Sequence, residues 1–324
     1  MILAGDIGGT HTRLALFQNE GDVKTPLREA TLSSRKYTGL VSAVRFFLEG
    51  QTGPIRAACF GVAGPVFEGR CTATNLPWCV DAAELAKALT IPSLKLINDL
   101  EAMVLGALVI EEKDLYILNA GAPEVKGNRA VIAAGTGLGE GMLFWDGTQY
   151  RSSASEGGHC DFAPRNPLEI ELLEFLLTRY QRVSYERLLS GPGLLNLYEF
   201  LKNRKESDEP AVLKARLKKE DPSAVITEMA LSGESELCVE AIDLFAAIYG
   251  AEAGNLALKV LATGGVYIGG GIAPKIVKPL SEGRFMKAYG DKGRFSDLVA
   301  RIPVHIILND QCALLGAAHC CLND

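Results

Sequence analysis

The chain has 324 residues, 48% of them hydrophobic and 22% charged, and its net charge is −6. This length and apolar content predict two packed lobes, with a ligand site between them as the first expectation. The acidic balance and the lack of lysine or arginine blocks argue against nucleic acid and anionic membranes as partners. No apolar run reaches the roughly 18 residues of a membrane span.

The eight cysteines form neither a C-x-x-C pair nor a disulfide framework, which favours reduced thiols in a cytoplasmic protein. Residues 1–6 lack a basic region and Asp6 interrupts their apolar run, so we expect no targeting signal.

The first third of the chain predicts an α/β lobe that opens with a glycine hairpin. Two short strands at 2–7 and 12–17 are joined by Gly8-Gly9-Thr10. A hairpin followed by a βαβ unit is typical of an α/β lobe. The further elements that we expect are a strand at 27–32, a helix at 39–48, a strand at 55–62, a helix at 81–89 and a strand at 94–97.

The opening pattern returns near residue 130, which indicates an internal duplication. A strand at 130–134, the turn Gly135-Thr136-Gly137-Leu138-Gly139 and a strand at 141–145 repeat it. Charges dominate residues 201–223, which we interpret as exposed helix and loop without a site. The remaining expected elements are helices at 169–180, 193–200 and 236–261, a strand at 265–268, a helix from about Pro274, a strand at 304–308 and a helix at 312–320. We expect a small lobe at 1–110, joined by 309–324, and a large lobe at 111–308.

Three glycine turns at predicted strand ends have the chemistry of a phosphate or nucleotide site. Gly5-Asp6-Ile7-Gly8-Gly9-Thr10 would expose backbone N–H groups to phosphate, and Asp6 could hold Mg²⁺ through water. Gly135-Thr136-Gly137 adds a hydroxyl, and Gly269-Gly270-Gly271 offers a flat surface to a purine or ribose. Each alone also fits an ordinary tight turn, but three together favour a nucleotide. No P-loop string occurs, and a strand rather than a helix follows Gly139, which argues against a dinucleotide fold.

Two polar segments could act on a sugar. Asn98-Asp99 ends a buried strand, at the sheet edge where ligands collect, and Asp99 could accept a proton from an attacking hydroxyl; the alternative is an aspartate that caps the next helix. Glu156-Gly157-Gly158-His159-Cys160-Asp161 gathers donors and acceptors suited to sugar hydroxyls, with a surface loop as the alternative. No matching pair at zinc spacing supports a metal there.

Over nearly its whole length the sequence resembles the bacterial glucokinase family, within the superfamily of actin, hexokinase and heat-shock ATPases. One departure is His11, where that family commonly has asparagine. The zinc-binding cysteine cluster of the related sugar-kinase and repressor family is missing. The matching segments are Gly5-Asp6-Ile7-Gly8-Gly9-Thr10, Ile97-Asn98-Asp99, Ala134-Gly135-Thr136-Gly137-Leu138-Gly139, Glu156 to Pro164, Glu186 to Gly193 and Gly269-Gly270-Gly271-Ile272.

The resemblance implies two ribonuclease H-like lobes, each a mixed sheet flanked by helices, with a cleft between them. It implies ATP-dependent phosphorylation of glucose at its 6-hydroxyl, with Mg²⁺ and Asp99 as base, in a cytoplasmic homodimer. The sugar ligands that it implies are Asn98, Asp99, Glu156, His159 and Glu186. Asn75, with Glu156 and Glu186, would shape the sugar pocket. A kinase for another hexose or amino sugar, and a nucleotide-dependent sugar sensor without turnover, stay open as alternatives.

Overall fold

The computed structural model describes the chain except residues 19–22, 24, 74–75, 154, 206–209 and 323–324. Its internal contacts divide it into two compact units. The first comprises residues 1–114, 141–154 and 309–324, and the second comprises 115–140 and 155–308. Residues 141–154, which the sequence led us to expect in the large lobe, thus group with the first unit.

The first unit is built on a five-stranded mixed sheet of order β3-β2-β1-β4-β8. β1 is antiparallel to β2, and β2 to β3, whereas β1, β4 and β8 run parallel, so the carboxyl ends of these last three share one edge. Between β4 and β8 the chain forms a small separate sheet of β5 (Val66–Phe67), β6 (Arg70–Thr72) and β7 (Cys79–Asp81). The large-sheet strands are β1 (Ile2–Ile7), β2 (His11–Phe17), β3 (Arg28–Ser33), β4 (Ala57–Val62) and β8 (Ser93–Asn98).

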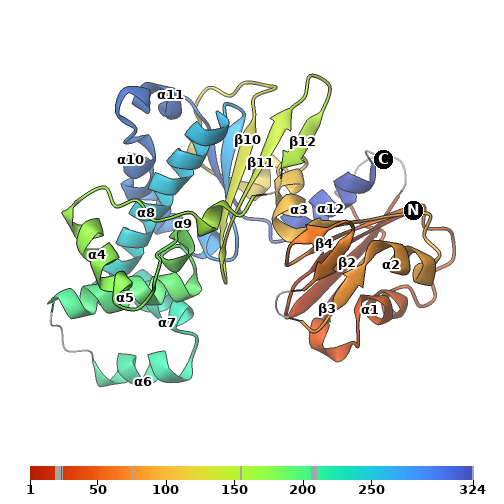
Figure 1. Ribbon diagram of the computed structural model, residues 1–324, viewed down its shortest axis with the longest axis horizontal. Coiled ribbons are helices and arrows are strands. Elements are labelled where there is room, and N and C mark those ends of the chain that lie inside the picture. Colours follow the sequence, from red (N-terminus) through yellow and green to blue (C-terminus); the bar gives the residue numbers. More distant parts are fainter. Residues whose placement is uncertain (19–22, 24, 74–75, 154, 206–209, 323–324) are drawn as a thin grey trace. The chain divides into compact units, whose positions relative to one another are not determined.

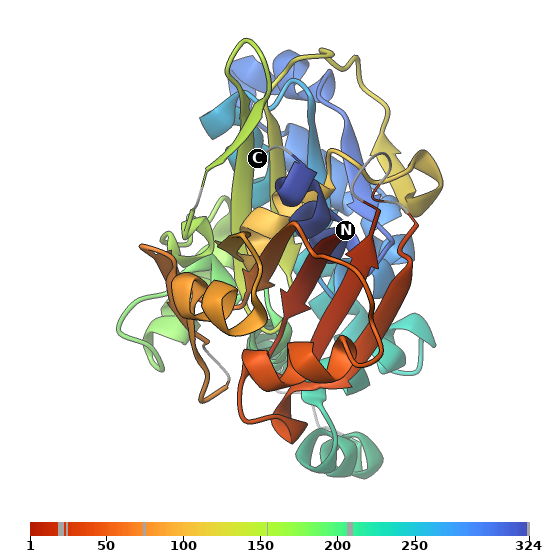
Figure 2. The same ribbon diagram turned by 90° about the vertical axis from the view of Figure 1, so that its right-hand side faces the viewer.

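Helices cover both faces of this sheet. α1 (Leu40–Phe47) and α2 (Ala82–Leu89) share a core with alternate residues of β4, Ala58 and Phe60. α3 (Asp99–Gly106) and α12 (Cys312–Leu322) pack together and against β1 and β4. Figures 1 and 2 show α1 on one side of the strands and the dark blue α12 on the other.

Two glycines allow the close approach of α3 and α12. A Cβ on Gly316 would lie 1.8 Å from the Ala102 carbonyl oxygen, and one on Gly106 would lie 2.1 Å from that of Cys312. The backbones of the two helices therefore meet where any side chain would hold them apart. This contact fixes α3, whose first residue is Asp99, on the sheet.

The second sheet has the order β12-β11-β10-β13-β14-β9. β10, β13 and β14 run parallel, with Ala133 beside Gly269, while β9 is antiparallel to β14 and β12 to β11. The carboxyl ends of β10 and β13, each followed by a glycine turn, therefore lie side by side. The strands are β9 (Leu115–Asn119), β10 (Arg129–Ala134), β11 (Leu138–Trp145), β12 (Tyr150–Ser153), β13 (Gly265–Gly269) and β14 (Val304–Ile307).

The 25-residue helix α8 (Glu236–Val260) is the central element of the second unit, and most of its residues are buried. It packs on α10, α5 and α7 and against β10 and β13 (Figure 1). Its Tyr249 hydroxyl donates to the Ile132 carbonyl at 3.0 Å and accepts from the Ala134 N–H at 3.2 Å, which anchors the end of β10. The other helices are α4 (Pro167–Leu177), α5 (Gly191–Lys205), α6 (Ala211–Lys219), α7 (Pro222–Leu231), α9 (Val277–Ser281), α10 (Arg284–Gly290) and α11 (Ser296–Ala300).

Most predicted elements are confirmed within a few residues, but one prediction was wrong in kind. The helix expected from Pro274 is a 3₁₀ turn at Ala273–Lys275, followed by the short α9. Ile276 interrupts them because its φ of −116° and ψ of 30° are not helical. Among the described residues, no helix combines the length and apolarity needed to cross a bilayer.

Candidate active site

The phosphate turn predicted at the start of the chain is a hairpin between β1 and β2. The Gly8 N–H donates to the His11 carbonyl at 2.9 Å, which closes the turn. The fully buried Ser34 supports it: its hydroxyl donates to the Gly8 carbonyl at 2.8 Å and its N–H donates to that of Thr10 at 3.0 Å. Ser34 could not be predicted from the sequence, because a serine in an exposed-looking segment carries no signal of a contact 26 residues away.

Asp6 is the penultimate residue of β1, two positions before Gly8. Arg13 stands opposite it on β2 and pairs with Asp310 at 2.6 Å. Burial raises the pKa of Asp6, Arg13 acts to lower it and Asp310 adds to the rise. A single carboxylate at the edge of a glycine turn matches the way Mg²⁺ is held beside phosphates, through one or two carboxylates and water.

Asn98 and Asp99 stand at the same sheet edge, where β8 ends and α3 begins. In the strand register Ile7 lies beside Val62, and Val62 beside Asn98. The cap of α3 is Asn98: its Oδ1 accepts from the Leu100 N–H at 2.8 Å and its Nδ2 donates to the Gly64 carbonyl at 3.0 Å. Asp99 Oδ1 also accepts from the Leu100 N–H, at 3.0 Å. Asp99 is thus the first helical residue rather than the cap, and it is partly exposed.

The second unit brings the two other glycine turns together. The Gly191 N–H donates to the Gly135 carbonyl at 2.9 Å, and the Ile272 N–H donates to that of Ala134 at 3.2 Å. Gly270 has a φ of +83°, and a Cβ on it would lie 2.2 Å from the Ala134 carbonyl oxygen. Glycine is therefore required at this position by both conformation and space.

A cavity of about 540 Å³ opens beside these turns, a volume typical of small-molecule sites. The amino-terminal residues of α5 and α7 contribute to its wall, but Ser190 and Asp221 already accept from the N–H groups of Gly193 and Ser223, so Lys275 supplies the positive charge for an anionic ligand. Its lining residues are Gly135, Thr136, Gly191, Pro192, Leu195, Asp221, Pro222, Ser223, Gly271, Ile272 and Lys275. Residues 201–223, where we expected no site, contribute Asp221, Pro222 and Ser223 to this wall, and Asp221 also caps α7.

His159 and Glu186 meet on two adjacent 3₁₀ turns of the same unit, η3 (Gly157–His159) and η4 (Tyr185–Arg187), and Glu156 directly precedes the first of them. His159 Nε2 lies 3.9 Å from Glu186 Oε2, and that oxygen accepts from the Leu138 N–H at 3.0 Å. A Cβ on Gly137 would lie 2.5 Å from the same oxygen. Glu186 therefore joins the predicted sugar turn to the predicted phosphate turn, although sequence reasoning reached it only through the family resemblance.

Arg182 holds the loop after η3. Its Nη1 donates to the His159 carbonyl and to Asp161 Oδ1, each at 2.7 Å. Asp161 is thus paired in a surface contact. Asn75, the remaining predicted sugar ligand, lies outside the described residues.

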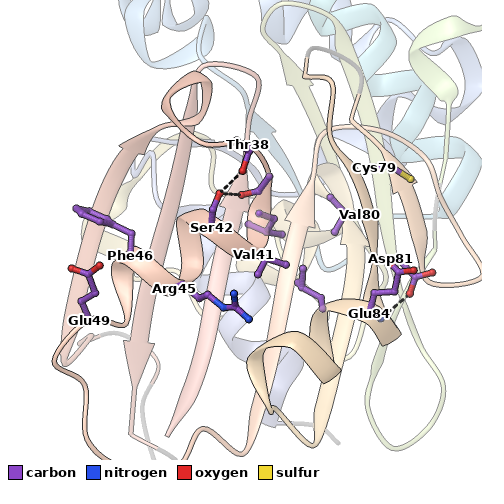
Figure 3. A pocket seen from close by; sticks show the side chains of 13 residues that line it. Thr38, Val41, Ser42, Arg45, Phe46, Glu49, Cys79, Val80, Asp81 and Glu84 are labelled. Carbon is purple, nitrogen blue, oxygen red and sulfur yellow. Dashed lines mark hydrogen bonds between the residues drawn. The ribbon is translucent and has the colours of Figure 1, made fainter.

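Another cavity, of about 520 Å³, lies between α1, α2 and β7 in the first unit (Figure 3). None of the site residues predicted from the sequence lines it. Its Asp81 carboxylate is already occupied as the cap of α2, where it accepts from the N–H groups of Ala83 and Glu84, and it pairs with Arg70. The cavity therefore adds no group to the site.

An α/β fold with glycine turns at strand ends, a carboxylate at a sheet edge and no P-loop defines a phosphotransferase of the actin-like ATPase class. Residues 3–324 match the family model described as glucokinase. A glucokinase of a Nostoc species is 44% identical, with 99% of this chain and 98% of that protein covered. The chain belongs to the glucokinase family and is an enzyme of that family.

Solved glucokinase structures have the same fold as this chain. A crystal structure of glucokinase from an Antarctic psychrotroph has a TM-score of 0.88 at 32% identity and covers 100% of this chain and 99% of that one. A glucokinase from Balamuthia mandrillaris, solved in complex with glucose, has a TM-score of 0.80 at 23% identity, with 98% and 92% covered. The actin-like α/β fold expected from the sequence is confirmed.

Proposed function

We propose that this protein transfers the γ-phosphoryl group of ATP to the 6-hydroxyl of glucose, the first step of glucose use in glycolysis. The observation that carries the proposal is the place of Asp99 in a member of the glucokinase family: it follows β8 at the edge that the carboxyl ends of the parallel strands β1, β4 and β8 share, and β1 leads into the glycine turn. Asp99 accepts the hydroxyl proton as the sugar oxygen attacks the phosphorus.

The chain's own groups bind and orient the two substrates. Asn98, Glu156, His159 and Glu186 bind the sugar hydroxyls, together with Asn75. Support comes from the backbone hydrogen bonds that fix Asn98 and Glu186, since fixed partners hold a hydroxyl in one orientation.

The nucleotide is assigned to the three glycine turns and to the cavity beside two of them. Gly8, Gly9 and Thr10 form the turn of the first unit, and Gly5 and Ile7 lie on the strand β1 that leads into it. In the second unit Gly135, Thr136, Gly137, Gly269, Gly270 and Gly271 form the pair of turns, which would cradle phosphates and pack against the nucleoside. Support comes from the wall of the cavity, where Lys275 suits an anion and Leu195 and Ile272 suit an apolar ring.

Mg²⁺ is proposed as the accompanying ion, with Asp6 holding it through water. Among the described residues, no three metal-ligating side chains gather, which suits an ion that keeps its waters and takes most ligands from phosphate. When bound, the ion would neutralise charge on the transferring phosphoryl group.

An assay for ADP release over a panel of hexoses and amino sugars, with the product identified by NMR, tests the proposal. Glucose should give glucose 6-phosphate with the highest kcat/KM. A preference for mannose or an amino sugar would assign another sugar kinase, and glucose binding without ADP release would assign a sensor. The proposed cytoplasmic homodimer is tested separately, by light scattering of the purified protein and by cell fractionation.

A further inference from the structure

Two buried glutamates, Glu140 on β11 and Glu252 on α8, face each other beneath the proposed sugar turn. Their exposures are 2% and 0%. The two side chains lie within hydrogen-bonding reach of each other, yet Glu140 Oε1 meets no donor among the described residues. Because carboxylates only accept hydrogen bonds, a contact between two of them requires a proton on one.

The hydrogen-bond donors around Glu252 indicate that the proton resides on Glu140. Lys259 Nζ donates to Glu252 Oε1 at 2.9 Å, and Asn255 Nδ2 donates to Oε2 at 2.8 Å. These donors stabilise Glu252 as a carboxylate, whereas Glu140 Oε1 accepts no hydrogen bond from the described residues. The titratable groups that interact with the pair are Tyr185, Lys259, Lys292 and Tyr249, and Cys160, Arg165 and Asp291 in turn face these neighbours.

The Glu140 carboxyl also touches the backbone of the sugar turn. A Cβ on Gly157 would lie 2.1 Å from Glu140 Oε2, and one on Gly158 would lie 2.1 Å from the Leu138 carbonyl oxygen. Glu156 and His159 flank these two glycines, so the carboxyl supports the segment that presents both. Tyr185, which hydrogen-bonds to Glu252, directly precedes Glu186.

We propose that Glu140 and Glu252 share one proton at neutral pH, and that Glu140 is thereby a positioning residue that keeps the Gly157-Gly158 turn in its glucose-binding form. This inference rests on the proposed function. Burial, and then the Glu252 carboxylate, raise the pKa of Glu140 to about 7. Loss of the proton places two like charges in contact in the interior, and their repulsion displaces the carboxyl that supports Gly157.

The proton therefore controls sugar affinity. If only the protonated form holds the turn, the apparent Kd for glucose rises with pH above about 7, by up to roughly tenfold for each pH unit. Because Glu140 touches the turn and not the reacting atoms, kcat at saturating glucose changes much less than KM.

The test compares wild type with Glu140→Gln, which mimics the protonated acid in shape. Glucose Kd is measured by calorimetry without nucleotide from pH 6 to 9. Asp243→Asn is the control, because Asp243 is a carboxylate on α8, the helix of Glu252, but pairs with Arg284 at 2.9 Å. We expect the Kd of wild type and control to rise with pH and that of Glu140→Gln to vary less than about twofold. A Gln variant that follows the wild-type profile overturns the proposal.

Infrared difference spectra of the wild type between pH 6 and 9 provide a readout that needs neither the variant nor glucose. They should show a buried protonated carboxyl that is lost as pH rises and that Glu140→Gln lacks; a wild type without that band overturns the proposal. If wild type binds no glucose at any pH, both the proposed function and the positioning role are contradicted. The infrared band then still reports whether the two glutamates share a proton.

Discussion

Replacing Gly316 with alanine tests whether the contact between α12 and α3 holds the proposed base in place. The added methyl would lie 1.8 Å from the Ala102 carbonyl oxygen and 2.5 Å from the Gly106 nitrogen. Both neighbours are backbone atoms of α3, so no side chain can rotate away. The helices must separate by about 1.5 Å to restore ordinary contact in a close-packed interior.

The expected change in the free energy of unfolding is the balance of two effects. Overpacking costs about 1–3 kcal/mol even where side chains can adjust, so the upper end applies against backbone. The better helix propensity of alanine returns about 1 kcal/mol. We expect a net loss of roughly 2 kcal/mol in the free energy of unfolding of the first unit, together with a lower kcat because α3 carries Asp99.

Tryptophan fluorescence during urea unfolding is the assay, because Trp78 and Trp145, the two tryptophans of the chain, both belong to the first unit. Gly39→Ala is the control in the same unit: Gly39 has an extended φ of 175° just before α1, and a Cβ added to it would meet nothing within 4 Å. It should lose less than about 1 kcal/mol, the cost of alanine in place of glycine at a helix N-cap. Equal stability of Gly316→Ala and wild type would refute the reasoning on backbone contact.

Three further predictions concern the second unit. Gly270→Ala should destabilise it by about 3 kcal/mol in thermal unfolding, because alanine is strained at a φ of +83° and meets the Ala134 carbonyl; Gly271→Ala, with open space, should not, and equal effects would count against the argument. The pKa of Glu140 is raised to about 7, so the folded state holds a proton that the unfolded chain releases near pH 4.5. The free energy of unfolding of wild type should therefore fall by up to roughly 3 kcal/mol relative to that of Glu140→Gln as pH rises from 4.5 through 7. A constant difference in Tm over that range would contradict this. Lys275→Met should raise the KM for ATP about tenfold and leave that for glucose unchanged, because Lys275 lines the cavity assigned to the nucleotide; an unchanged KM for ATP would remove Lys275 from that site.

The elements that sequence predicted well are those specified locally. The hairpin at Gly8-Gly9-Thr10 and the strand before Asn98 carry their turn residues and apolar pattern within a few positions. The three-stranded sheet between Val66 and Asp81 was missed because its strands are only two or three residues long and give no periodicity.

The contacts that complete the candidate site are distant in sequence, and that is why they were missed. Ser34 and Tyr249 support glycine turns 26 and 115 residues away. Glu186 gains its place from the Leu138 N–H, which no local pattern reveals. For α7 a signal did exist: Asp221 followed by Pro222 is typical of a helix start, but the surrounding charges masked it.

The Asp99→Asn variant tests the central claim most directly, because asparagine keeps the shape of the side chain and removes its basicity. Its kcat for glucose phosphorylation should fall by roughly 10² to 10⁴-fold, with glucose Kd changed only a few-fold. Glu101→Gln, on the same helix and bonded to Ser152, should keep wild-type kcat. A near-normal kcat in Asp99→Asn would contradict the assignment of Asp99 as the base.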